Sequence, residues 1–547
     1  MHSSFRKAIA FVLAAAICFV PATPVFANGG QDGDDGNTAT PIKHLVVIFQ
    51  ENVSFDHYFA TYPSATNPSG EPAFFARPGT PTVNGLTGSL LSNNPNFNNP
   101  GNGVNAINPF RLDRTQASTC DQDHNYGPEQ QAFDGGLMDM FPASVGVGES
   151  SFCAAAFSYG KGQGIVMGYY DGNTVTGLWN YAQHFAMNDN HYGTTFGPST
   201  PGVLNLVAGT TYPATPSAPQ AKIVPSNAGP GTIVGDLDPT GDVCSKGTTI
   251  RMSGPNVGDL LTSAGVTWGS FMGGFDLTAV NANGTTGCAR SSPATPANAG
   301  PTADYIPHHS FFNYYASTAN YTHTRPASVS EIGNAGPANH QYDLNDFYAA
   351  LKNENLPAVS FIKAVAAYDG HAGYSDPLLE QQFIVTLVNT LMQSREWGET
   401  AVVILWDDSD GWYDHQMSPI VNPSTVNTGV VNDSDELNGT GVCGHGAPLA
   451  GIEGRCGYGP RIPFVVISPW ARGNFVDHTL IDQSSVIRFI EDNWLGGQRI
   501  GGGSYDAIAG TLTQMFDFSQ DRDRGDEDRV LILDPMTGQP MYGHGHQ

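Results

Sequence analysis

Two apolar, β-branched segments of the chain are each followed directly by paired side chains that carry oxygen atoms. Glu51 and Asn52 follow the first segment, and Asp407 and Asp408 follow the second. Ligands of open α/β sheets bind beyond the carboxyl ends of the strands. Three carboxylates and one amide oxygen would suit calcium, magnesium, manganese or iron better than zinc. A helix cap is the alternative for a single acid, but paired oxygen ligands at two strand ends make a metal site an equally good explanation.

Four histidines near turn residues are candidates for binding an anion. They are His124, His308, His309 and His371. An imidazolium can bind a phosphoryl oxygen or protonate a leaving group near physiological pH. A lone histidine is more often structural, so the hypothesis depends on the four acting together.

Ser199 lies in a turn rich in glycine and proline at 196–202, before a mostly apolar stretch at 203–207. Glycine and proline on both sides could expose the hydroxyl on a turn that leads into a helix. Serine is common in such turns, so the turn alone does not identify a nucleophile.

The elements that would position these residues alternate between strands and helices. Apolar strands in such alternation predict an α/β fold, with a central, mostly parallel sheet that is covered by helices on both faces. We expect strands at 43–50, 359–362, 400–406 and 463–468, and helices at 54–62, 376–396 and 484–494.

Long irregular segments separate these elements. We expect loop insertions near 63–109, 208–304 and 416–460, and loops of this length are usually functional. No internal repeat, coiled coil or linker is evident. Residues 42–547 are therefore predicted to form a single domain.

The N-terminus has the features of an export signal. Arg6 and Lys7 precede an apolar run at 8–20, and small residues at 25 and 27 suit a cleavage site. A membrane anchor is the alternative, but the run is shorter than the ~20 residues needed to span a bilayer. We expect a signal peptide at 1–27, a disordered stretch at 28–41, a periplasmic or extracellular protein, and no stable membrane insertion.

Charge and cysteine content agree with export. The net charge of −27 would repel nucleic acids, so none is expected as a partner. Six cysteines remain beyond the predicted signal, and an even count in an exported chain predicts disulfides. We expect pairing between neighbours in the sequence, as Cys120–Cys153, Cys244–Cys288 and Cys443–Cys456.

Four motifs, in this order, resemble the bacterial phospholipase C and acid phosphatase family of the alkaline phosphatase superfamily. They occupy residues 50–59, 369–377, 406–415 and 461–470. The resemblance extends over roughly residues 42–495. It implies an alkaline-phosphatase-like fold and hydrolysis of phosphate esters.

The resemblance also implies a role for each candidate residue. Glu51, Asn52, Asp407, Asp408 and the hydroxyl of Ser199 would bind one divalent or iron cation. Ser199 would also be the nucleophile and form a phosphoserine. The four histidines would surround the phosphoryl group, and which of His308 and His309 points inward stays open. Cationic histidines in place of a second metal would favour acidic pH.

The turn at the predicted nucleophile distinguishes two branches of the family. Residues 197–203 read Gly-Pro-Ser-Thr-Pro-Gly-Val, whereas the phospholipase branch typically reads Gly-Pro-Thr-x-Pro-Asn-Arg. The chain therefore resembles the acid phosphatase branch, and we expect it to hydrolyse small phosphate monoesters. Two alternatives stay open: a phospholipase C that cleaves phosphatidylcholine-type lipids, and a non-catalytic secreted binding protein on a hydrolase scaffold.

Overall fold

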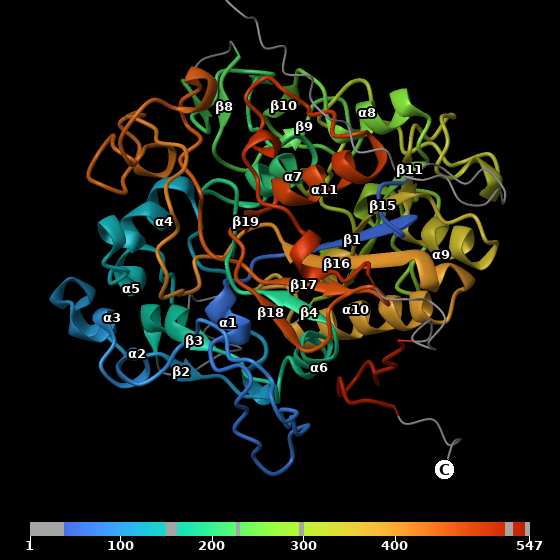
Figure 1. The fold of residues 1–547 in the computed structure, drawn as a ribbon. Coiled ribbons are helices and arrows are strands. Elements are labelled where there is room, and N and C mark those ends of the chain that lie inside the picture. The colour runs from blue at the N-terminus through green and yellow to red at the C-terminus, as the bar shows by residue number, and fades with distance from the viewer. Residues whose placement is uncertain (1–37, 149–160, 226–229, 295–299, 520–528, 542–547) are drawn as a thin grey trace, which may run out of the picture. The chain divides into compact units, whose positions relative to one another are not determined.

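An eight-stranded sheet forms the centre of the protein (Figure 1). The computed structural model describes residues 38–148, 161–225, 230–294, 300–519 and 529–541. The strands follow one another across the sheet in the order β14-β11-β15-β1-β16-β17-β4-β18. They are β1 (His44–Gln50), β4 (Ala186–Asn188), β11 (Trp268–Met272), β14 (Gln341–Asp343), β15 (Val359–Lys363), β16 (Thr400–Trp406), β17 (Phe464–Ile467) and β18 (Phe475–Asp477).

The strand directions confirm the prediction of a mostly parallel sheet. β1 pairs in parallel with β15 and with β16. β17 runs antiparallel to both of its neighbours, β16 and β4. Within the β1–β16 pair, Gln50 lies opposite Trp406. The two segments that carry the predicted metal ligands therefore leave the sheet side by side.

Helices cover both faces of the sheet, as expected (Figure 1). One face carries α1 (Phe55–Phe59), α6 (Thr176–His184) and α10 (Pro377–Met392), and the other carries α7 (Ser199–Ala208), α8 (Val257–Ala264) and α11 (Ser484–Trp494). α10 begins where predicted, because Asp376 caps it by accepting hydrogen bonds from Leu378 N and Leu379 N. It ends at Met392, four residues before the predicted end.

Shorter elements surround the main sheet. They are α2 (Ser89–Ser92), α3 (Pro95–Asn98), α4 (Tyr126–Phe133), α5 (Phe141–Ser144), α9 (Leu344–Lys352), β2 (Phe110–Arg111) with β3 (Gly168–Tyr169), β5 (His191–Tyr192) with β19 (Ile481–Asp482), β6 (Ala214–Pro216) with β10 (Thr249–Met252) and β9 (Asp238–Pro239), β7 (Ile223–Val224) with β8 (Thr232–Ile233), and β12 (Ser291–Pro293) with β13 (Pro301–Ala303). The segment near 208–304 is thus more than a loop insertion, because it contains α8 and the main-sheet strand β11. Glycine and serine within the Trp-Gly-Ser-Phe-Met sequence of β11 hid this strand from a search for apolar runs.

The N-terminal boundary also differs from the prediction. The stretch expected to be disordered extended to residue 41, but residues 39 and 40 are held by α11. Ala39 N donates to the carbonyl oxygen of Asn493, and Thr40 N donates to its side-chain oxygen, both at 2.9 Å. Residues 38–547 form one compact unit. The predicted signal peptide lies outside the described residues.

A buried guanidinium joins the segments that follow β1 and β16 to the segment before β17. Arg461 Nη2 lies 3.1 Å from both Asp56 Oδ1 and Asp414 Oδ2. The guanidinium also lies over the ring of Phe55, 4.3 Å from its centroid. Three of the four sequence motifs therefore meet at one ion-pair cluster.

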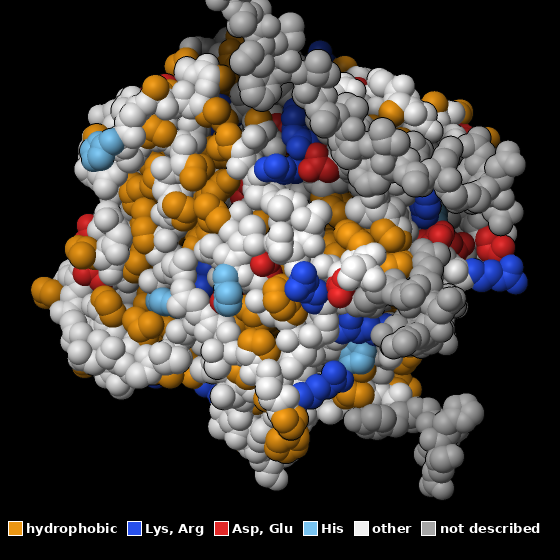
Figure 2. All heavy atoms as spheres, viewed as in Figure 1, with side chains coloured by type: hydrophobic (Ala, Val, Ile, Leu, Met, Phe, Trp, Pro, Cys, Tyr) orange, Lys and Arg blue, Asp and Glu red, His pale blue; other side chains and the backbone are white. Residues whose placement is uncertain are grey.

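Two of the predicted disulfides are present, Cys244–Cys288 and Cys443–Cys456. Cys153 lies outside the described residues, so its pairing with Cys120 stays a prediction. In the part of the chain that the structure describes, no helix has the length and apolar character needed to cross a bilayer. Figure 2 shows the described Lys and Arg side chains scattered over one face, so this face offers no basic patch for a nucleic acid backbone.

Candidate active site

The predicted nucleophile and metal ligands meet at the carboxyl ends of β1 and β16. Ser199 begins α7, and its Oγ lies 3.1 Å from Glu51 Oε2 and 3.3 Å from Asp408 Oδ2. The backbone nitrogen of Asn52 donates to Asp407 Oδ1 at 2.9 Å. All five side chains are at most 3% exposed. Segments far apart in the sequence thus form one buried cluster of oxygen atoms.

The chemistry of this cluster fits a bound cation. The side-chain oxygen of Asn52 faces Glu51 Oε2 and Asp407 Oδ1, which are also acceptors. Turning the amide over would satisfy these atoms through its nitrogen, at 2.7 and 3.2 Å; a cation between the oxygens would satisfy them equally. Among the described residues, the buried Asp407 Oδ2 has no hydrogen-bond partner. This orphaned acceptor favours the cation, because an unpaired buried oxygen is costly.

Electrostatics lead to the same conclusion. Burial, reinforced by the neighbouring carboxylate of Asp407, raises the pKa of Glu51 well above its usual value. The same two causes raise the pKa of Asp408. Both shifts arise because negative charges are crowded together away from water. A divalent cation would relieve this repulsion and keep the carboxylates ionised.

The start of α7 is held tightly against the end of β16. Glu129 Oε2 accepts a hydrogen bond from Gly197 N at 3.0 Å, while its Oε1 accepts one from Ser409 Oγ at 2.7 Å. A Cβ atom at Gly202 would lie only 2.5 Å from the carbonyl oxygen of Asp407. Glycine at this position therefore lets the candidate nucleophile approach the candidate metal ligands. The positive end of the helix dipole also favours an anion beside Ser199.

All four predicted histidines line a cavity of about 610 Å³, together with Ser199. His309 Nδ1 lies 3.2 Å from Glu51 Oε1, inside the carboxylate cluster. His308 Nδ1 lies 3.5 Å from Asp238 Oδ1, and its side chain is 28% exposed. The two adjacent histidines thus have different places: His309 lies beside the metal ligands and His308 lies nearer to solvent.

The other two histidines lie next to each other, with ring centroids 6.2 Å apart. His124 Nδ1 bonds to the carbonyl oxygen of Gln122 at 2.9 Å, and its Nε2 lies 3.3 Å from the amide nitrogen of Asn52. His371 Nδ1 bonds to the carbonyl oxygen of Ala372 at 2.5 Å, and its ring stacks on Tyr374. In both rings Nδ1 lies against a backbone carbonyl oxygen, so that Nε2 is the atom that can meet a substrate, although Nε2 of His124 also contacts the Asn52 amide.

The histidines differ in charge. Burial lowers the pKa of His371, and burial together with nearby cationic groups lowers that of His309 well below its usual value. Burial opposes protonation of His124 as well, but the carboxylates of Asp408, Asp121 and Asp410 outweigh it and raise the pKa well above the usual value. Of these three, His124 is the residue whose surroundings favour the cationic form.

Sequence reasoning missed two charged residues of the cluster. Lys363, the last residue of β15, donates a hydrogen bond from Nζ to Glu51 Oε1. Asp369 Oδ2 lies 3.9 Å from His309 Nδ1. A signal was available for Asp369, because it begins a motif that also contains His371. Lys363 directly follows the strand predicted at 359–362, where a lysine is expected to reach into solvent.

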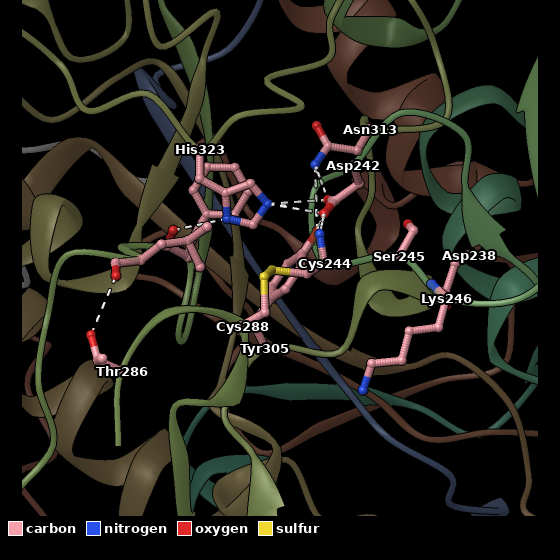
Figure 3. The surroundings of a disulfide bond; sticks show 12 residues. Asp238, Asp242, Cys244, Ser245, Lys246, Thr286, Cys288, Tyr305, Asn313 and His323 are labelled. Atoms are coloured by element: carbon pink, nitrogen blue, oxygen red, sulfur yellow. Dashed lines mark hydrogen bonds and ion pairs between the residues drawn. A yellow bond between two sulfur atoms is a disulfide. The ribbon is translucent and has the colours of Figure 1, made fainter. Parts of the chain in front are cut away.

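Buried hydrogen bonds to Asp242 hold the loop that carries His308 and His309 in place (Figure 3). Asp242 Oδ2 accepts hydrogen bonds from the hydroxyl of Tyr305 at 2.5 Å and from Asn313 Nδ2 at 2.8 Å, at the two ends of this loop. His323 Nε2 lies 3.2 Å from both carboxylate oxygens of Asp242. The Cys244–Cys288 disulfide begins two residues after Asp242. One buried carboxylate therefore holds both ends of the histidine loop.

Comparisons with known proteins agree with the motifs. The sequence model of the Phosphoesterase family matches residues 42–495. The chain is 25% identical over 483 residues to the non-hemolytic phospholipase C of Pseudomonas aeruginosa, an alignment that covers 87% of this chain and 57% of that protein. It is 25% identical over 536 residues to phospholipase C B of Mycobacterium tuberculosis, with 94% and 85% covered.

The chain therefore spans just over half the length of the Pseudomonas relative and most of the mycobacterial one. Among solved structures, a protein in the alkaline phosphatase superfamily from Vibrio parahaemolyticus matches 66% of this chain and 67% of its own. Its TM-score is 0.27 and its identity is 13%.

Proposed function

Because the chain belongs to the phosphoesterase family, it is a phosphoric ester hydrolase, and we propose that it is an exported, metal-dependent acid phosphatase with Ser199 as its nucleophile. One observation carries this proposal. The hydroxyl of Ser199 lies within a buried set of four oxygen-bearing side chains, three of them carboxylates, at 3.1 Å from Glu51 and 3.3 Å from Asp408. A cation bound by this set would activate the serine hydroxyl for attack on a phosphate ester.

Glu51, Asn52, Asp407 and Asp408 would hold the cation with the oxygen of Ser199. Such an ion, divalent or iron, would lower the pKa of the serine hydroxyl and polarise a phosphoryl oxygen. Ser199 attacks the phosphorus in line and forms a phosphoserine, while the leaving alkoxide departs on the far side. A water molecule then releases phosphate by attack from that same side.

The histidines act on the phosphoryl group and the leaving group. His124, whose surroundings favour its cationic form, would bind an equatorial phosphoryl oxygen through Nε2 in place of its contact with the Asn52 amide. His371, on the same side of the cavity, adds a second donor once it is protonated. His308 lies nearest to solvent and is the candidate that protonates the leaving alkoxide. Histidines that must carry charge support an acidic optimum.

A phospholipase C is the second candidate function. The two relatives named above are phospholipases C, which favours this alternative. The Gly-Pro-Ser-Thr-Pro-Gly-Val turn at 197–203 supports the phosphatase instead. A non-catalytic binding protein is the least supported function, because the nucleophile and every predicted metal ligand are present.

A substrate panel tests the proposal. The purified protein should release phosphate from a chromogenic phosphate monoester faster at acidic than at neutral pH, and faster than it releases phosphocholine from phosphatidylcholine vesicles. Faster cleavage of the vesicles would replace the phosphatase with the phospholipase. Absence of both activities in the metal-loaded protein would leave the binding-protein alternative.

Export is part of the same proposal. The disulfides Cys244–Cys288 and Cys443–Cys456 support an oxidising compartment. Fractionation of the producing cells should find the protein in the periplasm or the medium, with its N-terminus cut after residue 27. Recovery of the uncut chain from the cytoplasm would contradict export.

A further inference from the structure

A second group of metal-ligating side chains lies directly beside the proposed cation site. It consists of Glu51, His309 and Asp369, all buried, with one ligand atom of each within 4.8 Å of the others. His309 Nδ1 lies 3.2 Å from Glu51 Oε1 and 3.9 Å from Asp369 Oδ2. Two carboxylates and an imidazole are a ligand set that divalent transition metals accept.

The ammonium group of Lys363 already lies within this second group of side chains. Lys363 is 1% exposed, and its Nζ donates to Glu51 Oε1, the same oxygen that faces His309. The carboxylates of Asp407 and Asp369 also attract this ammonium. A lysine buried this deeply among acids stands where a metal ion would otherwise balance their charge.

The two oxygens of the Glu51 carboxylate have different partners. Oε1 meets the ammonium and His309, whereas Oε2 faces Ser199 Oγ at 3.1 Å. Each oxygen thus belongs to one of two adjoining groups of ligands. The first group contains no positive charge, whereas the ammonium of Lys363 lies within the second.

We propose that the ammonium of Lys363 takes the place of a second divalent cation, so that the site binds one ion, and that Glu51, His309 and Asp369 form a second cation site when this ammonium is removed. The positive charge acts in two ways. It occupies Glu51 Oε1, and it repels any divalent ion that approaches Asp369 and His309. A neutral side chain of similar length removes both effects and keeps all three ligands.

This inference rests on the proposed cation site, but its test needs no substrate. The full mature chain is stripped with a chelator and titrated with Mn²⁺, and bound ions are counted by calorimetry and by electron paramagnetic resonance. The wild type should bind one Mn²⁺ with an isolated-ion spectrum. Lys363→Met should bind two, with a coupled spectrum because both ions share Glu51.

Two control variants make the count decisive. Lys352→Met removes an exposed lysine at the end of α9 and should still bind one ion. Lys363→Met combined with Asp369→Asn removes a ligand of the second site and should return the count to one. Lys363→Gln replaces Lys363→Met if circular dichroism shows that the latter is unfolded.

Two results would overturn the inference: two ions in the wild type, or a single ion in both folded Lys363 variants. Neither result would bear on the hydrolase proposal, which is tested by Ser199 variants and by the release of phosphate. Conversely, a metal-loaded wild type that hydrolyses no ester would refute the phosphatase, and a second ion in Lys363→Met would still support this inference.

Discussion

Ser199 Oγ lies 3.1 Å from Glu51 Oε2, although 148 positions separate the two residues in the sequence. The contact exists because α7 begins where β1 ends, and Gly202 lets the helix approach the end of β16 closely. It joins the candidate nucleophile to the candidate metal ligands. Changes to this contact and to the groups around it should alter activity, metal binding or stability.

Replacing the nucleophile should abolish turnover without unfolding the chain. Ser199→Ala removes one oxygen from a buried cluster, and we expect turnover to fall by several powers of ten. Ser418→Ala is the control, because Ser418 is also buried but donates to Tyr458 O outside the site. Near-normal turnover in Ser199→Ala, or no phosphoserine in quenched wild-type enzyme, would remove Ser199 from the mechanism.

Metal binding and activity should be lost together when a ligand is neutralised. Asp408→Asn removes one negative charge beside Ser199, so metal content after dialysis and ester hydrolysis should both fall. Asp492→Asn, which alters surface ion pairs with Arg488 and Arg499 away from the site, should leave both unchanged. Full activity of Asp408→Asn after exhaustive chelation would show that the site is misassigned.

Activity should peak at acidic pH. Burial lowers the pKa of His371 below its ordinary value of about 6.5, so its cationic form increases as pH falls. Bound phosphate would raise that pKa. As pH rises, kcat should therefore begin to fall at a higher pH than kcat/KM does.

The variant His371→Ala should have a lower kcat, and its activity should depend less on pH over this range. His478→Ala, at a histidine whose side chain is 68% exposed, should keep the wild-type profile. An alkaline optimum of the intact enzyme would argue against cationic histidines even with Ser199 confirmed as the nucleophile.

Glu380, a buried acid, should contribute to a decrease in stability between weakly acidic and weakly alkaline pH. Burial raises the pKa of Glu380 from 4.5 to about 8. Between these values the folded chain holds a proton that the unfolded chain has released, so the free energy of unfolding falls as pH rises. The slope from this group is at most about 1.4 kcal/mol per pH unit.

Glu380→Gln should remove that slope in urea unfolding measured across the window. Glu354→Gln, at a side chain that is 56% exposed, is the matched control. Identical pH dependence of wild type and Glu380→Gln would mean that Glu380 is ionised in the folded chain.

The two described disulfides should differ in their effect on catalysis. Replacing Cys244 and Cys288 by serine opens a loop of 44 residues and should cost up to about 4 kcal/mol. Because this bond adjoins Asp242, kcat should fall as well. Replacing Cys443 and Cys456, which are 13 residues apart, should cost about 3 kcal/mol and leave kcat intact. Equal kcat values in the two double-serine variants would show that Asp242 does not position the histidine loop for catalysis.

The sequence predicts the ligands of the site better than the balance of charge around them. Glu51 and Asp407 follow strands with clear apolar runs, so their meeting could be inferred from the rule that parallel strands end at one edge. Lys363 could not be found in this way. A lysine at the end of a short strand normally reaches into solvent, and only the crowding of acids around it keeps it buried.

Strand direction and weak strands were also beyond the sequence. The apolar run of β17 fits a parallel or an antiparallel neighbour equally well, and the strand pairs antiparallel with β16. β11 contains glycine and serine, yet it is buried because β14 and β15 flank it. Tertiary packing decides such cases, since local propensity is a poor guide to strands.

The Arg461 cluster implies how this fold can diverge. Asp56 and Asp414 share one buried guanidinium, and loss of Arg461 would leave two carboxylates in the interior without it. Replacement of Arg461 alone should therefore be rejected by selection, whereas joint replacement of the three by apolar residues should be tolerated. In an alignment of relatives the three columns would covary, and they would mark descent more faithfully than the loops around them.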